Sequence, residues 1–166
     1  MIDKLVTVWV RYCNLVLGDG WVVTQSEAIV GKGAVRPKKP YLTLKIISGP
    51  NDYTIDDELI VDSNGFQQIF SQKSFTISIQ AFRGRNNDAL NLLKTQLSNP
   101  DHIDFLRKNG KISVTTRGGV TDISRQLETG FEPRSTMDIN FCTRVATPTK
   151  VGIIEKVGRV ERENGQ

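Results

Sequence analysis

The sequence has few of the residues from which catalytic and metal sites are usually built. It contains one histidine, His102, and two cysteines, Cys13 and Cys142, in 166 residues. Histidine is the usual metal ligand and general base, so its scarcity removes most metal-site and catalytic-triad chemistry. The two cysteines lack CxxC spacing and cannot alone complete a structural zinc site. We expect two reduced, mostly buried thiols.

Long hydrophobic runs are also absent. No apolar stretch approaches the ~20 residues that a membrane helix needs. The N-terminal segment carries Asp3, Lys4 and Arg11 among its apolar residues, so we expect neither a signal peptide nor a membrane partner, and synthesis in the cytoplasm. The composition, 38% hydrophobic and 24% charged, excludes wholesale disorder. The length suits one domain, or one domain with an arm.

Motifs that carry chemistry are incomplete. Gly31-Lys32-Gly33 resembles part of a phosphate loop, but Ser26 stands where that loop needs its first glycine. Asp62-Ser63-Asn64-Gly65 begins like a calcium loop but lacks the closing glutamate, and Asn-Gly is explained by a hairpin turn. Asp56-Asp57-Glu58 could supply paired carboxylates, yet consecutive strand residues point to opposite faces. The sequence therefore predicts no enzyme, no cofactor and no bound metal.

Charge is distributed in two blocks, although the net charge is only +4. Between Ala28 and Asn51 every charged residue is basic, and between Asp52 and Gln72 every one is acidic. Either both are solvated loops, or they are complementary patches in a head-to-tail contact between identical subunits. The candidate interface residues are Lys32, Arg36, Lys38, Lys39, Asp56, Asp57 and Glu58, together with Arg83 and Arg85.

Three helical segments are predicted from apolar spacing. The first has one apolar face and ends at Gly18-Asp19-Gly20; its face is formed by Ile2, Leu5, Val6, Trp9, Cys13 and Val16. The second carries the stripe Leu90, Leu93 and Leu97, with Asn87 as its N-cap. The third opens at Asn99-Pro100 and ends at Asn109-Gly110. Ile103, Phe105 and Leu106 are expected to pack inward.

Strands are predicted where apolar residues alternate with polar ones. The strand from Tyr41 should be ended by Gly49-Pro50-Asn51-Asp52. A hairpin should join residues 57–62 to 66–71 through Ser63-Asn64-Gly65. Further strands are expected over 75–81, 112–117, 137–145 and 151–160. Pro148 should end the strand over 137–145. The stretch 120–133 is open between a loop and an irregular strand. Residues 21–40 are expected to form an extended arm.

This order predicts an α+β domain with a mainly antiparallel sheet. The N-terminal helix and the central helical segment should pack on one face of that sheet. Residues 1–160 are expected to form the single domain, with the arm at about 21–40, and residues 161–166 a flexible tail.

Several segments resemble the tail terminator (neck) proteins of tailed bacteriophages. The first is Arg36-Pro37-Lys38-Lys39-Pro40-Tyr41-Leu42-Thr43-Leu44-Lys45-Ile46-Ile47. The others are Gly130-Phe131-Glu132-Pro133-Arg134, Met137-Asp138-Ile139-Asn140-Phe141 and Val151-Gly152-Ile153-Ile154-Glu155. Each is ordinary strand patterning with prolines, so the resemblance rests on their order and spacing.

The resemblance implies a structural virion protein of the tail and neck, assembled in the host cytoplasm. Such proteins form a homohexameric ring on the head-proximal end of the tail tube. They stop tube polymerisation and offer a surface to the head-to-tail connector. In contractile tails the sheath protein is a further partner, and DNA passes through the lumen without sequence-specific binding. The arm 21–40 and the hairpin 57–71 are the candidate docking elements.

Two other function classes stay open at this point. A basic nucleic-acid-binding protein agrees with the sequence pI of 9.2 and with Arg83-Gly84-Arg85. Steep salt dependence of tight DNA binding would favour that class. A small enzyme with an unrecognised site is the third.

Overall fold

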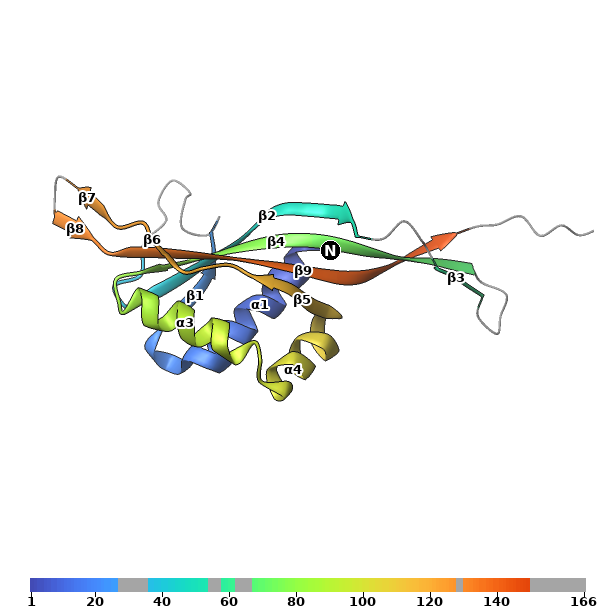
Figure 1. The fold of residues 1–166 in the computed structure, drawn as a ribbon, viewed down its shortest axis with the longest axis horizontal. Coiled ribbons are helices and arrows are strands. Elements are labelled where there is room, and N and C mark those ends of the chain that lie inside the picture. The colour runs from blue at the N-terminus through green and yellow to red at the C-terminus, as the bar shows by residue number, and fades with distance from the viewer. Residues whose placement is uncertain (27–35, 54–57, 62–66, 128–129, 150–166) are drawn as a thin grey trace, which may run out of the picture.

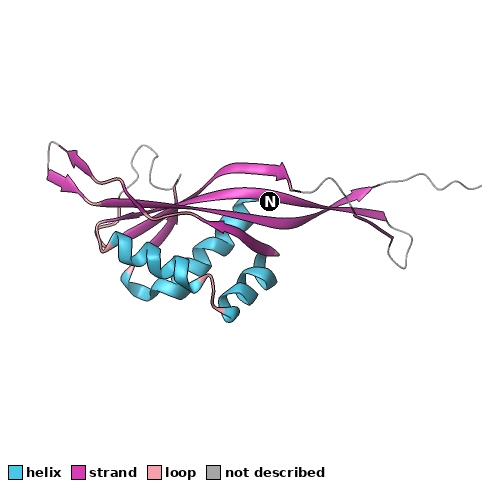
Figure 2. Ribbon diagram, viewed as in Figure 1, coloured by secondary structure: helices cyan, strands magenta, loops and turns pink. Residues whose placement is uncertain are grey.

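The three longest helices lie together on one side of a long sheet (Figures 1 and 2). A computed structural model describes residues 1–26, 36–53, 58–61, 67–127 and 130–149. The helices are α1 (Ile2–Leu17), the short 3-10 helix η1 (Gly18–Gly20), α3 (Asn86–Gln96) and α4 (Pro100–Gly110). The strands are β1 (Val22–Gln25), β2 (Tyr41–Asp52), β3 (Glu58–Val61), β4 (Gln67–Phe82), β5 (Ile112–Arg117), β6 (Thr121–Asp122), β7 (Arg125–Leu127), β8 (Gly130–Glu132) and β9 (Arg134–Thr149).

The described strands form one large sheet and one small ribbon. The large sheet has the order β1-β2-β4-β9-β5, with β3 also paired to β4 and β6 to β9. Every pairing is antiparallel except that between β1 and β2. Strands β7 and β8 form the ribbon. The predicted α+β class, with a mainly antiparallel sheet and helices on one face, is confirmed.

The core lies between the helices and one face of the sheet. The predicted apolar face of α1 buries Leu5, Trp9 and Cys13. Trp9 lies against Phe141 of β9, with ring centroids 5.5 Å apart, and Phe141 stacks on Phe75 of β4 at the same distance. The predicted leucine stripe of α3, Leu90, Leu93 and Leu97, is buried in the same cluster. Alternation along β9 adds Met137, Ile139 and Phe141 to it.

Helix ends differ from the prediction in detail. Asn99 does cap α4, because its side chain accepts a hydrogen bond from the Asp101 amide. Asn87 is not the cap of α3: the helix begins at Asn86, and the Asn87 side chain instead accepts from the Ser135 hydroxyl at 2.7 Å. Ile103 was predicted inside but is exposed on α4. Gly110 is still helical, and Lys111 takes the left-handed conformation after it.

Two strands run further than their sequence signals predicted. Strand β2 does not end at Gly49-Pro50 but continues to Asp52, with irregular register after Ile46 and again after Ser48. These bulges accommodate a proline that cannot donate to the ladder. Strand β9 likewise continues through Pro148, which lies opposite Gln68, to Thr149.

The two predicted segments 66–71 and 75–81 are parts of one strand, β4. No glycine or proline interrupts residues 72–74, and its pairing with β9 is continuous from Gln67 to Phe82. In the predicted arm, Val22–Gln25 is instead the parallel edge strand β1. The stretch 120–133, for which the sequence permits either a loop or an irregular strand, contains β6, β7 and β8.

Some sequence predictions fall on residues outside the described ranges. These are the Asn64-Gly65 turn, the strand over 151–160 and the tail 161–166. The hairpin itself is confirmed by its arms, because Val61 of β3 pairs with Gln67 of β4. Within the described ranges, no helix combines the length and the apolar character required to cross a membrane.

Candidate assembly surfaces

The residues best suited to chemistry have structural roles. His102 lies in α4, where its Nδ1 is 3.2 Å from the Gln96 carbonyl oxygen and its ring meets Tyr12 edge-on. Cys13 and Cys142 are free and buried, as predicted. Among the described residues, no three His, Cys, Asp or Glu side chains come together as a metal site would require.

The predicted basic residues gather at one end of the molecule, which we call the basic end. Arg36, Lys38 and Lys39 precede β2, while Arg83 and Arg85 follow β4, and these two strand ends are neighbours because Tyr41 pairs with Phe82. Arg83 joins the two segments, since its guanidinium donates a 2.9 Å hydrogen bond to the Pro37 carbonyl oxygen. All five side chains are exposed. Lys32 lies outside the described residues.

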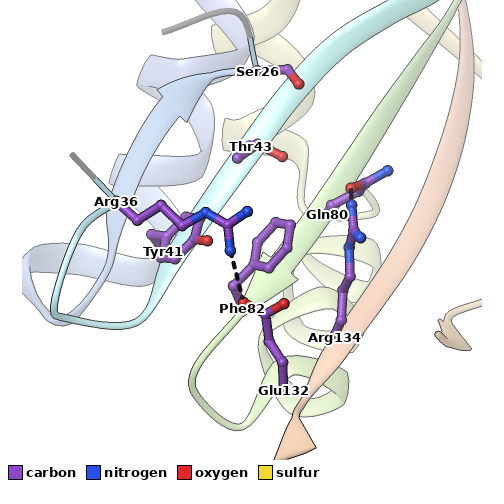
Figure 3. A pocket seen from close by; sticks show the side chains of 8 residues that line it. All are labelled: Ser26, Arg36, Tyr41, Thr43, Gln80, Phe82, Glu132 and Arg134. Atoms are coloured by element: carbon purple, nitrogen blue, oxygen red, sulfur yellow. Dashed lines mark hydrogen bonds and ion pairs between the residues drawn. The ribbon is translucent and has the colours of Figure 1, made fainter. Parts of the chain in front are cut away.

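A polar cavity of about 310 Å³ opens beside the basic end (Figure 3). Its floor is aromatic: Tyr41 stacks on Phe82 with centroids 4.6 Å apart, and the Arg134 guanidinium lies 4.7 Å from the Phe82 centroid. Burial raises the pKa of the Tyr41 phenol, so this hydroxyl stays protonated. At the rim, Arg36 forms a 3.4 Å ion pair with Glu132.

Contacts within the chain hold the Arg134 side chain in the cavity. Arg134 donates a 2.6 Å hydrogen bond to the Gln80 side chain, and its Nε is buried without a hydrogen-bond partner among the described residues. No sequence signal marks Gln80, and Glu132 and Arg134 are noted only within the segment that resembles tail terminators. Their neighbours come from strands far apart in the chain, so no local pattern signals the cavity.

The acidic residues lie at the opposite end of β4. Glu58 begins β3 and pairs with Arg144 of β9, and the Arg144 guanidinium also covers the Phe70 ring at 4.1 Å. Asp52, at the end of β2, pairs with Lys73. Both described acids therefore already have a partner within the chain. Asp56 and Asp57 lie outside the described residues.

The described members of the two groups of predicted interface residues thus lie at opposite ends, not at one site. Glu58 lies opposite Phe70 and Tyr41 lies opposite Phe82, twelve residues further along β4. At ~3.3 Å per strand residue this is about 40 Å. No contact within one subunit can join them.

Exposed apolar side chains also mark the two ends. Leu59, Ile60 and Val61 are all exposed on β3, and Phe131 on β8 is 66% exposed. Figure 1 shows β3 at one extreme of the sheet and the β7–β8 ribbon at the other. From the sequence, Phe131 is noted only within the segment that resembles tail terminators, and Leu59, Ile60 and Val61 are given no role. Three consecutive apolar residues nevertheless make a strand apolar on both faces.

These features define an α+β protein whose two ends differ in charge and both carry exposed apolar side chains. The family model of the phage neck terminator protein matches residues 2–166, so the chain belongs to the phage neck terminator family. The comparison with curated proteins found no match. Family membership confirms the resemblance drawn from the sequence, and it implies a location in the virion tail or neck with tail-tube and neck partners.

Proposed function

We propose that this protein forms a ring that caps the head-proximal end of the phage tail tube. The ring stops polymerisation of the tube and joins it to the head-to-tail connector. Membership of the neck terminator family over nearly the whole chain is the observation that carries this proposal. The ring is homohexameric, as the resemblance to tail terminators implies, and the sheath is an additional partner in contractile tails.

The separation of the charged groups supports a ring. Contacts between unlike surfaces of identical subunits repeat until the ring closes, so each subunit needs two different patches. The basic end supplies Lys38 and Lys39, which are exposed. The acidic patch is Asp56, Asp57 and Glu58. Since Glu58 has an internal partner, Asp56 and Asp57 supply most of the attraction.

Electrostatics sets the register of this contact more than its strength. Exposed ion pairs contribute only ~0–1 kcal/mol each. Of the remaining basic candidates, Arg36 is shared with Glu132, and Arg83 and Arg85 extend the surface. Lys32 stays a prediction from the sequence. The apolar side chains at the two ends must therefore provide the remaining affinity.

The asymmetry of the fold supports a terminating role. A tube built of head-to-tail contacts has no internal stopping point, so a terminator must bind the last tube ring on one surface and refuse a further ring on another. Here the three longest helices cover one face of the sheet, and no described helix covers the other (Figure 2). Two such different surfaces suit two different partners.

Electron microscopy of the purified protein, alone and with tail-tube protein, tests the proposal. Rings alone, and tubes ending in a ring at one end, are expected. Tail tubes of unlimited length in the presence of an equimolar amount of the protein contradict it. Lys38→Glu with Lys39→Glu should weaken ring assembly while leaving the melting temperature unchanged.

Nucleic-acid binding is the second candidate, and the basic end favours it. Arg83 and Arg85 are exposed there beside Lys38 and Lys39. Charge on a lumen through which DNA passes would have the same appearance, without sequence-specific binding. Tight DNA binding by the isolated protein, falling steeply with salt, would favour a dedicated nucleic-acid-binding protein. Weak binding with assembled rings favours the terminator.

A further inference from the structure

The sheet is longer than the helices that cover it. Beyond the helices, β3 pairs with residues 67–70 of β4, and these pair with residues 146–149 of β9. We call this three-stranded extension the strand wing. Figure 2 shows the wing projecting past the helical layer.

The apolar face of the core continues onto the wing. Because pairing between β4 and β9 has no register shift, Ile69 shares a face with Phe75 and Ile77, which point toward the helices. Leu59 lies directly opposite Ile69, so it points to the same side, as does Val61 two residues later. Leu59 is 55% exposed and Val61 54% exposed. Within the described ranges, the face that the helices bury in the core is therefore left exposed on the wing.

The outer face of the wing also exposes an apolar side chain. It carries Ile60, which is exposed, beside the Arg144–Phe70 contact. Among the described residues β3 pairs with β4 alone, so its other edge has free backbone groups. An apolar strand with an open edge is an aggregation hazard that proteins normally cover or pair. The wing thus has the properties of a surface that is completed by a partner chain.

Charge indicates which partner that is. The segments flanking β3 in the sequence contain Asp56, Asp57 and Asp62, so two wings would repel each other. The end with the β7–β8 ribbon is basic: its described residues include Arg36, Lys38, Lys39, Arg83, Arg85, Arg125 and Arg134 against Asp88, Asp122 and Glu132. That same end exposes Phe131, an aromatic side chain of the type that anchors interfaces.

We infer that the strand wing of one subunit docks on the β7–β8 ribbon of a second copy of the chain. Leu59 and Val61 cover Phe131 in this contact, and the charged groups around them set its direction. The inference rests on the proposed assembly of identical subunits, and it assigns the apolar contact that holds neighbours together. Both patches lie on every subunit, so the contact propagates around a ring.

A matched pair of substitutions tests the assignment. Leu59→Asp should abolish ring formation, measured by light scattering after size exclusion and by microscopy. Leu15→Asp, on α1, is the control because Leu15 is exposed to the same 55%; it should assemble like the parent. Both should melt within a few degrees of the parent. Rings in the Leu59→Asp variant would overturn the inference.

Cross-linking between separately labelled chains gives a second readout that needs no loss of function. Chains carrying Leu59→Cys are mixed with chains carrying Phe131→Cys and treated with a short bismaleimide. A cross-linked dimer should form in this mixture and not in a mixture of Leu59→Cys with Leu15→Cys chains. The parent, whose Cys13 and Cys142 are buried, is the blank.

The outcomes separate this contact from ring formation in general. Rings of the parent without the specific cross-link overturn the inference and leave the proposed function intact. The specific cross-link in open oligomers that never close supports the wing contact and contradicts the ring. If neither rings nor the specific cross-link form, both the inference and the proposed function are contradicted.

Discussion

At the scale of single residues, aromatic side chains hold the helices to the sheet. Phe141 has no exposed surface and contacts both Trp9 of α1 and Phe75 of β4. It thereby links elements that are more than 130 residues apart in sequence (Trp9 to Phe141). Removing its ring leaves a cavity that neither helix nor sheet can easily close.

Phe141→Ala should therefore lower the free energy of unfolding by ~3–5 kcal/mol, a large part of the ~5–15 kcal/mol of an ordinary domain. Urea denaturation measures this loss. Phe131→Ala is the matched control, because Phe131 is 66% exposed and its ring supports no core; its denaturation midpoint should match the parent's. A parent-like midpoint for Phe141→Ala would refute the register assigned to β9.

Buried ionisable groups predict how stability changes at alkaline pH. Burial raises the pKa of the Cys13 thiol above its ordinary value of 9.0 and that of the Tyr12 phenol above 10.0. The folded state then holds protons that the unfolded state loses, so stability falls as pH rises above about 9. Tyr12 also donates a 2.8 Å hydrogen bond to the Leu93 carbonyl oxygen.

Melting temperatures between pH 7 and pH 11 test this sign. The parent should be stable up to about pH 9 and then lose stability steadily. Cys13→Ala should melt lower at pH 7, because it leaves a small cavity, but should show a shallower alkaline decline. An identical pH profile in both proteins would contradict the role assigned to Cys13.

At the scale of elements, the long strands stay paired through irregular positions because local backbone features permit it. Strand β2 passes through Gly49 with a backbone φ of +105°, a conformation that favours glycine. A Cβ at that position would lie 2.5 Å from the Ser74 carbonyl oxygen of β4. The irregular end of β2 thus stays paired only because residue 49 has no side chain.

Gly49→Ala should destabilise the fold by roughly 1–3 kcal/mol, because both the backbone conformation and the contact with β4 become strained. Gly119→Ala is the control, since a Cβ there meets nothing within 4 Å. Chemical denaturation compares the two. Equal midpoints would show that β2 separates from β4 at this end without cost.

Strand lengths show where sequence reasoning worked and where it did not. Alternation predicted the inner faces of β4 and β9 correctly, because a side-chain period of two is a local property. It did not predict that β4 is continuous or that β9 passes Pro148, because a strand's length depends on the partner beside it. Each of these strands supplies the other's hydrogen bonds over sixteen residues.

At the scale of the whole molecule, the fold is asymmetric from end to end and from face to face. The basic end, with Lys38, Lys39, Arg83 and Arg85, lies about 40 Å from Glu58 along β4. In the proposed ring, each end meets a different neighbour and the protein acts by recognition between surfaces.

The purified protein should accordingly hold no stoichiometric zinc and should not hydrolyse nucleotides. Elemental analysis and phosphate-release assays measure these properties, and chelator treatment should leave the melting temperature unchanged. One tightly bound metal ion per chain would overturn this prediction and reopen the enzyme class.

The sequence by itself determined the helices, the inner faces of the strands and the existence of two charge blocks. Each of these follows from spacing within a few residues, which local sequence records directly. Only the tertiary structure decided that the described members of the two blocks lie at opposite ends, that Arg36 and Glu58 have internal partners, and that Leu59 and Val61 are exposed on the strand wing. These properties depend on which strands become neighbours, and that choice is made by burial of the whole core.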